Sequence, residues 1–218
     1  GVASLVLMTA LCDSFRKGQR QNMRQLGDNI VIIWNGRTER QAGGQRAGRR
    51  VWLEQRDVEA IRAQCPLASV VAGEIGRETV AASRFNSGRF QTLGVTPQYL
   101  QLRSLPVEGG RTVTAADCAE ARRVCVLGAS VRKQLFEGRR DVLGSTVSIH
   151  GYPYRVIGLM PEKRQSSSYD GWDNEKILIP QSSLLRDCPP DDSWYRPGRL
   201  NTIIYRPASV TEWNAAQH

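Results

Sequence analysis

The sequence predicts an α+β fold, and three patterns support this prediction. The apolar run 124–127 leads through Gly128 into a helix, two alternating strands meet at His150-Gly151, and apolar runs at 29–34 and 200–207 are typical of buried strands. With 218 residues, of which 40% are hydrophobic, the chain is long enough to bury a sizeable core.

In the first half, a polar loop is expected at 36–50, after the strand at 29–34. A helix is expected at 53–65, where Val58 and Ile61 have helical spacing and Pro66 ends it. The run 69–95 predicts two or three strands with a turn around Ser87-Gly88.

A short helix should follow near 96–105, because a Thr at its start caps orphan amides and Pro97 suits the first helical position. In the second half we expect the strand 124–127, a helix at 130–136, a hairpin at 145–160 and a strand at 176–180. A linker at 186–198, the strand 200–207 and a final helix from about Ser209 complete the chain. Pro153 cannot donate to a ladder, so its strand should lie at an edge or bulge there.

The strand–Gly–helix junction at Gly128 resembles junctions that hold a phosphate or a nucleophile in enzymes. However, the chain has no Gly-x-x-x-x-Gly-Lys-Ser/Thr, Gly-x-Gly-x-x-Gly or Gly-x-Ser-x-Gly pattern. Ser130 is therefore predicted to be a helix N-cap. A phosphate on this helix start, or a hydrolase that uses Ser130, is the weaker alternative.

The residues that enzymes and metal sites need are scarce. His150 and His218 are the two histidines of the chain, and no Cys-x-x-Cys pair occurs. His150 is expected to be a turn residue, and the acidic pair at 191–192 lies in a Pro-rich linker, where solvation is its expected role. The sequence thus predicts no catalytic residue, no metal site and no cofactor.

The chain is basic, with 30 Lys and Arg against 21 Asp and Glu and a formal net charge of +9. Such a charge permits nucleic acid or an anionic membrane as a partner. The basic residues are scattered and lack the interleaved aromatic residues of single-strand binders, so a solvated basic surface is favoured. Nucleic-acid binding remains the alternative, and it predicts steep weakening with salt.

The N-terminal segment is uncharged up to Asp13 and basic afterwards, which is the reverse of a signal peptide. Its apolar part is shorter than the roughly 20 residues that span a bilayer. Two interpretations stay open. The segment is the end of a transmembrane helix that begins outside this sequence, which we favour, or it is an amphipathic core helix with a stripe of Leu5, Met8, Leu11, Phe15 and Met23.

A series of motifs between Gly94 and Gly158 carries a resemblance that covers nearly the whole chain. In order, the motifs are Gly-Val-Thr-Pro-x-Tyr-Leu, Glu-Gly-Gly-Arg, Val-Leu-Gly, Leu-Gly-x-x-Val and Val-Ile-Gly. The series resembles the periplasmic core domain of MacB-like ABC transporter permeases, and the segment 1–33 is similar to the end of their first transmembrane helix and the first periplasmic strand.

The resemblance implies a two-lobed extracytoplasmic domain. Residues 1–26 would be the end of the transmembrane helix and its periplasmic extension. A porter-like α/β lobe would combine 27–91 with 201–218, and a Sabre-like mixed α/β lobe would be inserted at 92–200. Because the chain must leave the first lobe and return to it, the strands near 30–33 and 202–205 should share a sheet.

The resemblance also implies a non-catalytic part of an inner-membrane transporter that faces the periplasm. Family members transmit ATP-driven motion across the membrane and expel substrates from the periplasm or the outer leaflet. The implied partners are a second permease copy, a cytoplasmic ABC ATPase that is fused or separate, and in some cases a periplasmic adaptor and an outer-membrane channel. A lipoprotein-release permease is the alternative within this class.

An extracytoplasmic location would permit disulfides. Cys118 and Cys125 flank a short turn before a strand and are a candidate pair, although Cys65 and Cys188 are alternative partners for either. Cys12 is expected to be unpaired. Neither Cys118 nor Cys125 belongs to the motif series above.

Overall fold

The computed structural model describes residues 30–37, 48, 50–103, 105–139, 141–165, 168–190 and 198–208. The expected helix at 1–26, the final helix from 209 and the acidic pair at 191–192 lie outside the described residues. Within the described part, no helix has both the length and the apolar character that crossing a membrane requires.

Strands dominate the described residues, and short helices lie between them. The strands are β1 (Val31–Trp34), β2 (Gly36–Arg37), β3 (Arg50–Val51), β4 (Ala68–Ala82), β5 (Ser87–Val95), β6 (Gly109–Gly110), β7 (Val124–Leu127), β8 (Thr146–Ile149), β9 (Tyr152–Leu159), β10 (Lys176–Pro180) and β11 (Thr202–Pro207). The helices are α2 (Gln55–Gln64), α3 (Pro97–Arg103), α4 (Ala115–Ala119), α5 (Ala129–Leu135), the 3₁₀ helix η1 (Asp173–Glu175) and α6 (Gln181–Asp187).

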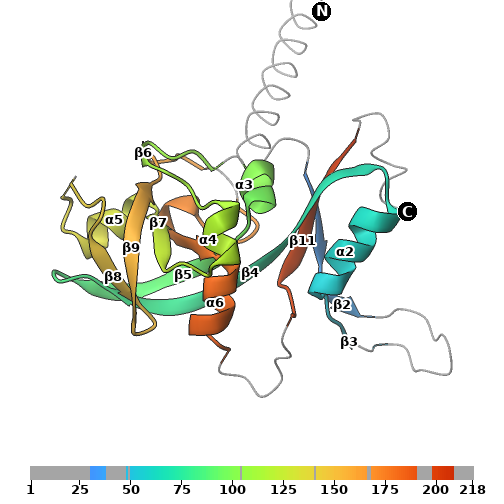
Figure 1. Cartoon of the computed structure of the whole chain (residues 1–218), viewed down its shortest axis with the longest axis horizontal. Helices are drawn as coiled ribbons and strands as arrows, with labels where there is room; N and C mark the ends of the chain where they lie inside the picture. The colour runs from blue at the N-terminus through green and yellow to red at the C-terminus, as the bar shows by residue number, and fades with distance from the viewer. Residues whose placement is uncertain are drawn as a thin grey trace, which may run out of the picture.

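The main sheet closes on itself over part of its length. Its strand order in the described residues is β1-β11-β4-β5-β10-β7-β9-β6, and β8 pairs with both β4 and β9. The strands β4, β5, β10, β7, β9 and β8 therefore form a complete circuit, whereas β11 and β1 extend from β4 as an open flank. Figure 1 shows the closed part on the left and the open flank, with α2 beside it, on the right. Closure removes exposed strand edges and holds the strands in one arrangement.

The strand β4 belongs to both parts. Its first half pairs with β11, ending at the pair Glu74–Thr202, and its second half pairs with β5, starting at Ile75–Gly94. Two apolar clusters lie on opposite faces of β4, with Val71 on one and Ala72 on the other. Alternate side chains of a strand point to opposite faces, so each face of β4 packs against its own cluster.

The two ends of the described chain meet in the open flank, as predicted. The strands β1 and β11 are antiparallel neighbours, with Val31 opposite Tyr205 and Trp34 opposite Thr202. The α+β class and the two-lobed organisation are confirmed: the flank with α2 is one lobe, and the closed sheet is the other. The division at 91/92 stays a prediction, although that point lies inside β5, and the pairing of β4 favours a division between Glu74 and Ile75.

Most predicted elements are present. The hairpin of β8 and β9 turns at His150 and Gly151, whose φ angles of 51° and 86° are both left-handed. Such a pair of angles defines a type I′ turn, whose twist matches that of the strands it joins. At Pro153 the strand β9 pairs with β8 alone, and its pairing with β7 begins at Arg155, so the edge prediction is confirmed.

The turn predicted at Ser87-Gly88 lies elsewhere. Ser83 N donates to Asn86 O at 2.9 Å, and β5 has already begun at Ser87. The Ser83 hydroxyl accepts from Phe85 N at 3.0 Å, a local side-chain bond that holds the chain reversal at 83–86. The prediction overlooked this serine.

The cap prediction at the strand–Gly–helix junction is wrong. The N-cap of α5 is Gly128, and Ser130 lies inside the first turn of the helix. A Cβ on Gly128 would overlap the carbonyl oxygen of Asn174, while Gly128 N donates to Lys176 O at 2.9 Å. The glycine therefore lets α5 contact the backbone that leads into β10, and the junction serves packing.

Replacement of Gly128 by Ala should lower the free energy of unfolding by roughly 2 kcal/mol, because the added methyl group has to displace backbone atoms. Gly36→Ala is the matched control, since a Cβ there meets nothing within 4 Å. Urea denaturation of both variants measures the effect. An equal effect of the two substitutions would show that the close approach at Gly128 is unimportant.

Candidate functional site: a buried charge cluster at the lobe junction

Charged side chains are buried where β4 passes from one lobe to the other. We define the junction cluster as the charged or hydroxyl-bearing side chains that meet there, namely Glu74, Arg103, Lys163, Tyr169, Asp170, Asp173 and Lys176. Glu74, Arg103, Asp173 and Lys176 are at most 3% exposed. Residues of these types are rarely buried unless they are paired, so each of them is expected to have a partner of opposite charge or a hydrogen-bond partner.

Local structure brings these side chains together from distant parts of the chain. Helix α3 starts after Thr96, whose hydroxyl accepts from Tyr99 N at 3.3 Å, and Arg103 is its last residue. Asp173 opens η1, and Lys176 is the first residue of β10. Glu74 lies at the point where β4 changes partner.

The cations and carboxylates of the cluster form a network of ion pairs. Arg103 Nη2 lies 3.3 Å from Asp170 Oδ1 and 3.1 Å from Asp173 Oδ1. Lys176 Nζ bridges the same two residues, at 2.7 Å from Asp170 Oδ2 and 3.2 Å from Asp173 Oδ1. Lys163 Nζ adds a contact of 2.9 Å to Asp173 Oδ2.

Tyr169 connects this network to β4. Its hydroxyl donates to Glu74 Oε2 at 2.7 Å, and the guanidinium of Arg103 lies over its ring at 4.7 Å from the centroid. Glu74 belongs to the strand that continues into the open flank, whereas the other members belong to α3 and the segment 163–176. The Tyr169–Glu74 hydrogen bond therefore joins two parts of the fold that are far apart in sequence.

The environment shifts the pKa values of Glu74 and Asp173 in opposite directions. Burial, and next the charge of Asp170, raise the pKa of Glu74 to about 7, against the lowering effects of Tyr169, Arg103 and Lys176. Burial alone would also raise the pKa of Asp173, but Arg103, Lys176 and Lys163 outweigh it, and that pKa is lowered. Asp173 is thus held as an anion, while Glu74 can exchange a proton near neutral pH.

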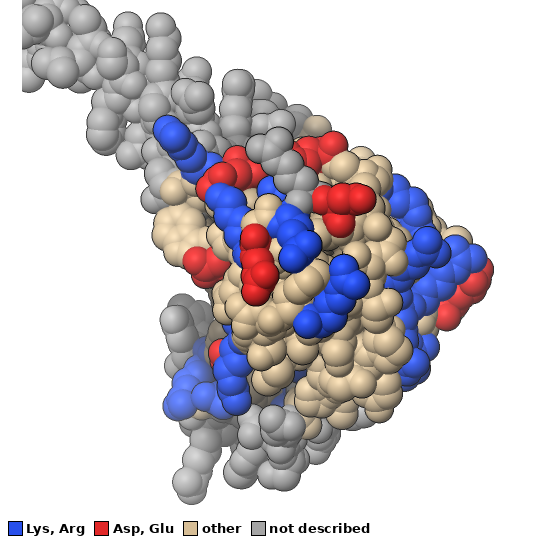
Figure 2. Space-filling model, turned by 90° about the vertical axis from the view of Figure 1, so that its left-hand side faces the viewer, with Lys and Arg blue, Asp and Glu red and all other residues tan. Residues whose placement is uncertain are grey.

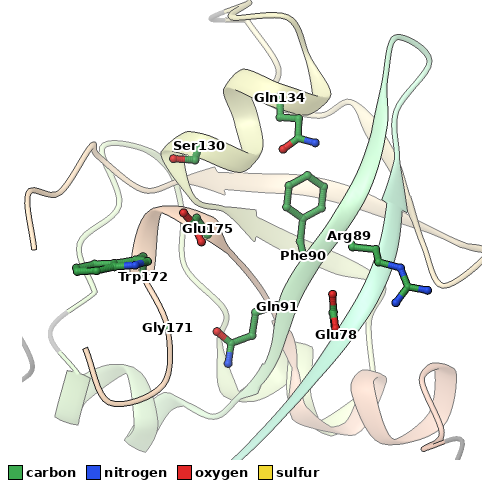
Figure 3. Close-up of a pocket in the computed structure, with 9 residues that line it drawn as sticks. All are labelled: Glu78, Arg89, Phe90, Gln91, Ser130, Gln134, Gly171, Trp172 and Glu175. Atoms are coloured by element: carbon green, nitrogen blue, oxygen red, sulfur yellow. The ribbon is translucent and has the colours of Figure 1, made fainter. Parts of the chain in front are cut away.

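A pocket of ≈ 380 Å³ lies beside the cluster. Figure 3 shows its lining, in which Ser130 and Gln134 of α5 stand above Gln91 of β5, and the Trp172 ring points away from Phe90. His150 lines a different pocket, of ≈ 340 Å³, together with Gly76, Arg77 and Pro189. The structure therefore does not bring Ser130 and His150 together as a nucleophile and a base. Among the residues described, no group of His, Cys, Asp and Glu side chains is arranged to hold a metal ion.

Cys118 and Cys125 are separate thiols in the structure. Cys118 Sγ donates to Val95 O at 3.4 Å and packs against the apolar cluster that contains Val126. Cys125 is fully buried in the other cluster, on the opposite face of β7. Burial raises the pKa of both thiols, which lowers their reactivity. The disulfide between them stays a prediction, and their placement does not favour it.

Basic side chains are mixed with acidic ones on the surface of the closed sheet. Figure 2 shows Lys and Arg interspersed with Asp and Glu on the face that it draws. Several basic groups of the closed sheet and its helices are paired, such as Lys133 with Glu162 at 2.9 Å and Arg132 with Glu108 at 3.2 Å. This distribution fits the predicted solvated surface better than a tract that follows a phosphate backbone.

The chain is similar to a family of known proteins over its whole length. The family model described as "MacB-like periplasmic core domain" matches residues 1–218. The macrolide export ATP-binding/permease protein MacB of Bdellovibrio bacteriovorus is 29% identical over 181 residues, and the pyoverdine export ATP-binding/permease protein PvdT of Pseudomonas entomophila is 30% identical over 183 residues. These matches cover 83% and 84% of the chain but 27% of each relative, so the chain spans about a quarter of their length.

Solved structures share the fold at lower identity. The extracellular domain of the ABC-type transporter YknZ from Gram-positive bacteria aligns with a TM-score of 0.68 at 15% identity, covering 86% of this chain and 88% of that one. The periplasmic region of MacB from Actinobacillus actinomycetemcomitans aligns with a TM-score of 0.66 at 22% identity, covering 90% and 82%. Both similarities confirm the architecture described above.

Lys176→Met should lower the free energy of unfolding by about 3–5 kcal/mol, because it leaves Asp170 and Asp173 buried with one cation fewer. Lys133→Met is the matched control, since it breaks an exposed pair and should have a much smaller effect on the free energy of unfolding. Urea denaturation near pH 8 compares the two variants. Equal effects would mean that Lys176 contributes no more to the free energy of unfolding than a residue of an ordinary surface ion pair does.

Proposed function

The chain belongs to the family of MacB-like periplasmic core domains, and we propose that it transmits ATP-driven motion in an ABC transporter that exports its substrate. In this proposal the domain does no chemistry. It faces the periplasm from the inner membrane, and its movement expels substrate from the periplasm or the outer leaflet. The family match over the whole chain supports this assignment.

The path of β4 is the structural observation that supports a mechanical role. This strand of 15 residues takes part in the open flank and in the closed sheet without a break in its assignment. A paired strand resists bending because each residue is held by ladder hydrogen bonds, so a force on one lobe is passed to the other. The buried ion pairs beside Glu74 add rigidity at the crossing point.

The proposal includes partners that lie outside this chain. A second permease copy would form a dimer, and a cytoplasmic ABC ATPase, fused or separate, would supply the energy. A periplasmic adaptor and an outer-membrane channel are further candidate partners. Relatives are named for the export of macrolides and of pyoverdine, which supports export as the direction of transport.

Locking the domains of the two copies together tests the mechanical role. Cysteines are introduced at positions where the closed sheets of the two copies face each other, in an intact transporter whose native cysteines have been replaced. After oxidation we expect ATP hydrolysis to persist at least in part while export stops, because the ATPase still turns over but the movement of the cross-linked domains is blocked. Reduction of the same protein should restore export.

Single-cysteine variants, which cannot cross-link, control for oxidation itself. Export that continues unchanged in the locked transporter would contradict the mechanical role. The 218-residue chain alone should neither bind nor hydrolyse ATP, because its sequence lacks the Gly-rich loop with Lys that holds β- and γ-phosphates. Turnover of a substrate by the isolated chain would also refute the proposal.

A further inference from the structure

Two buried polar side chains face each other across the strand pair that links the lobes. Glu74 of β4 lies opposite Thr202 of β11 in the antiparallel register, so their side chains share one face of the sheet. Thr202 is 6% exposed, and its hydroxyl oxygen has no hydrogen-bond partner among the described residues. A buried hydroxyl without a partner is costly and needs an explanation.

Charged and hydroxyl groups of the other lobe surround Glu74 on the same face. These groups are Tyr99 and Arg103 of α3, Tyr169 and Asp170 of the segment before η1, and Lys176 of β10. All of them except Tyr99 shift the pKa of Glu74, and the charge of Glu74 in turn raises the pKa of Tyr99. Asp173 forms ion pairs with two of these groups, Arg103 and Lys176. An ionised Glu74 is attracted by the two cations and repelled by Asp170.

We propose that Glu74 is a proton-binding site that couples the two lobes. When Glu74 is ionised, its carboxylate accepts from Tyr169 and is drawn toward the cations of the junction cluster. When a solvent proton binds to a carboxyl oxygen, that O–H donates to Thr202 Oγ1 and fastens β4 to β11, while Tyr169 keeps its bond to Oε2. Uptake of a proton therefore adds a bond from Glu74 to the open flank, while its bond to Tyr169 in the junction cluster stays in place.

The pH range of this switch follows from the environment of Glu74. Its pKa is raised from the ordinary 4.5 to about 7 in the folded protein, with burial as the main cause. For an acid whose pKa is raised on folding, the ionised form is the costly one. The stability gained from the protonated form is therefore fully present below pH 4.5 and is lost as the pH rises through about 7.

A pH titration of the ¹⁵N-labelled chain by NMR tests the proposal. Asn201 N donates to Glu74 O at 2.8 Å, so the amides of Asn201 and Thr202 report on the flank, and that of Tyr169 reports on the cluster. We expect all three to titrate with one midpoint near 7, and we expect this transition to vanish in Glu74→Gln. Glu78→Gln is the matched control: Glu78 is exposed on the same strand, and its replacement should leave the midpoint unchanged.

Tyr169→Phe keeps the test decisive if Glu74→Gln does not fold. Loss of the hydroxyl removes a bond that favours the ionised form, so the midpoint should rise by about one pH unit. A midpoint below 5 in the parent chain, or the same transition in Glu74→Gln, would overturn the proton site. Titration of Tyr169 without any response of Asn201 and Thr202 would overturn the coupling between lobes.

Discussion

The structure depends on one strand that serves two sheets. Because β4 pairs with β11 up to Glu74 and with β5 from Ile75 onward, neither lobe can complete its sheet without the other. The closed circuit of six strands and the flank built from both ends of the described chain follow from this sharing. The proposed role in passing on movement would benefit from such a connection, since ladder hydrogen bonds hold β4 within the sheet and two apolar clusters pack against its two faces.

The charge cluster beside this connection costs free energy to bury, so stability is a poor reason for its presence. Apolar residues of similar volume often stabilise a core as well as a buried ion pair does, or better. Ion pairs differ from apolar contacts in that they demand one relative position of their partners, and Arg103, Asp173 and Lys176 satisfy each other in the arrangement described. Glu74 adds a group whose charge responds to the surroundings near neutral pH.

Local elements could be predicted from the sequence, and long-range contacts could not. Pro97 after a threonine and the His150-Gly151 turn have local signals, and the structure has both elements where they were expected. Gly128 stands out in the sequence, but its role depends on its contact with Asn174, which no local pattern reveals. Arg103 ends an amphipathic helix like any solvated basic residue, so its burial against Asp173 follows only from the pairing of distant strands.

Native-state hydrogen exchange tests the central claim that the shared strand makes the two lobes one body. At pH 6, below the raised pKa of Glu74, we expect the amides of Ile203 and Ile204 in β11 to exchange with the same free energy of opening as those of Cys125 and Val126 in β7. All four residues are fully buried. If β11 opened at a clearly lower free energy while β7 stayed protected, the lobes would be independent units and the account would be contradicted.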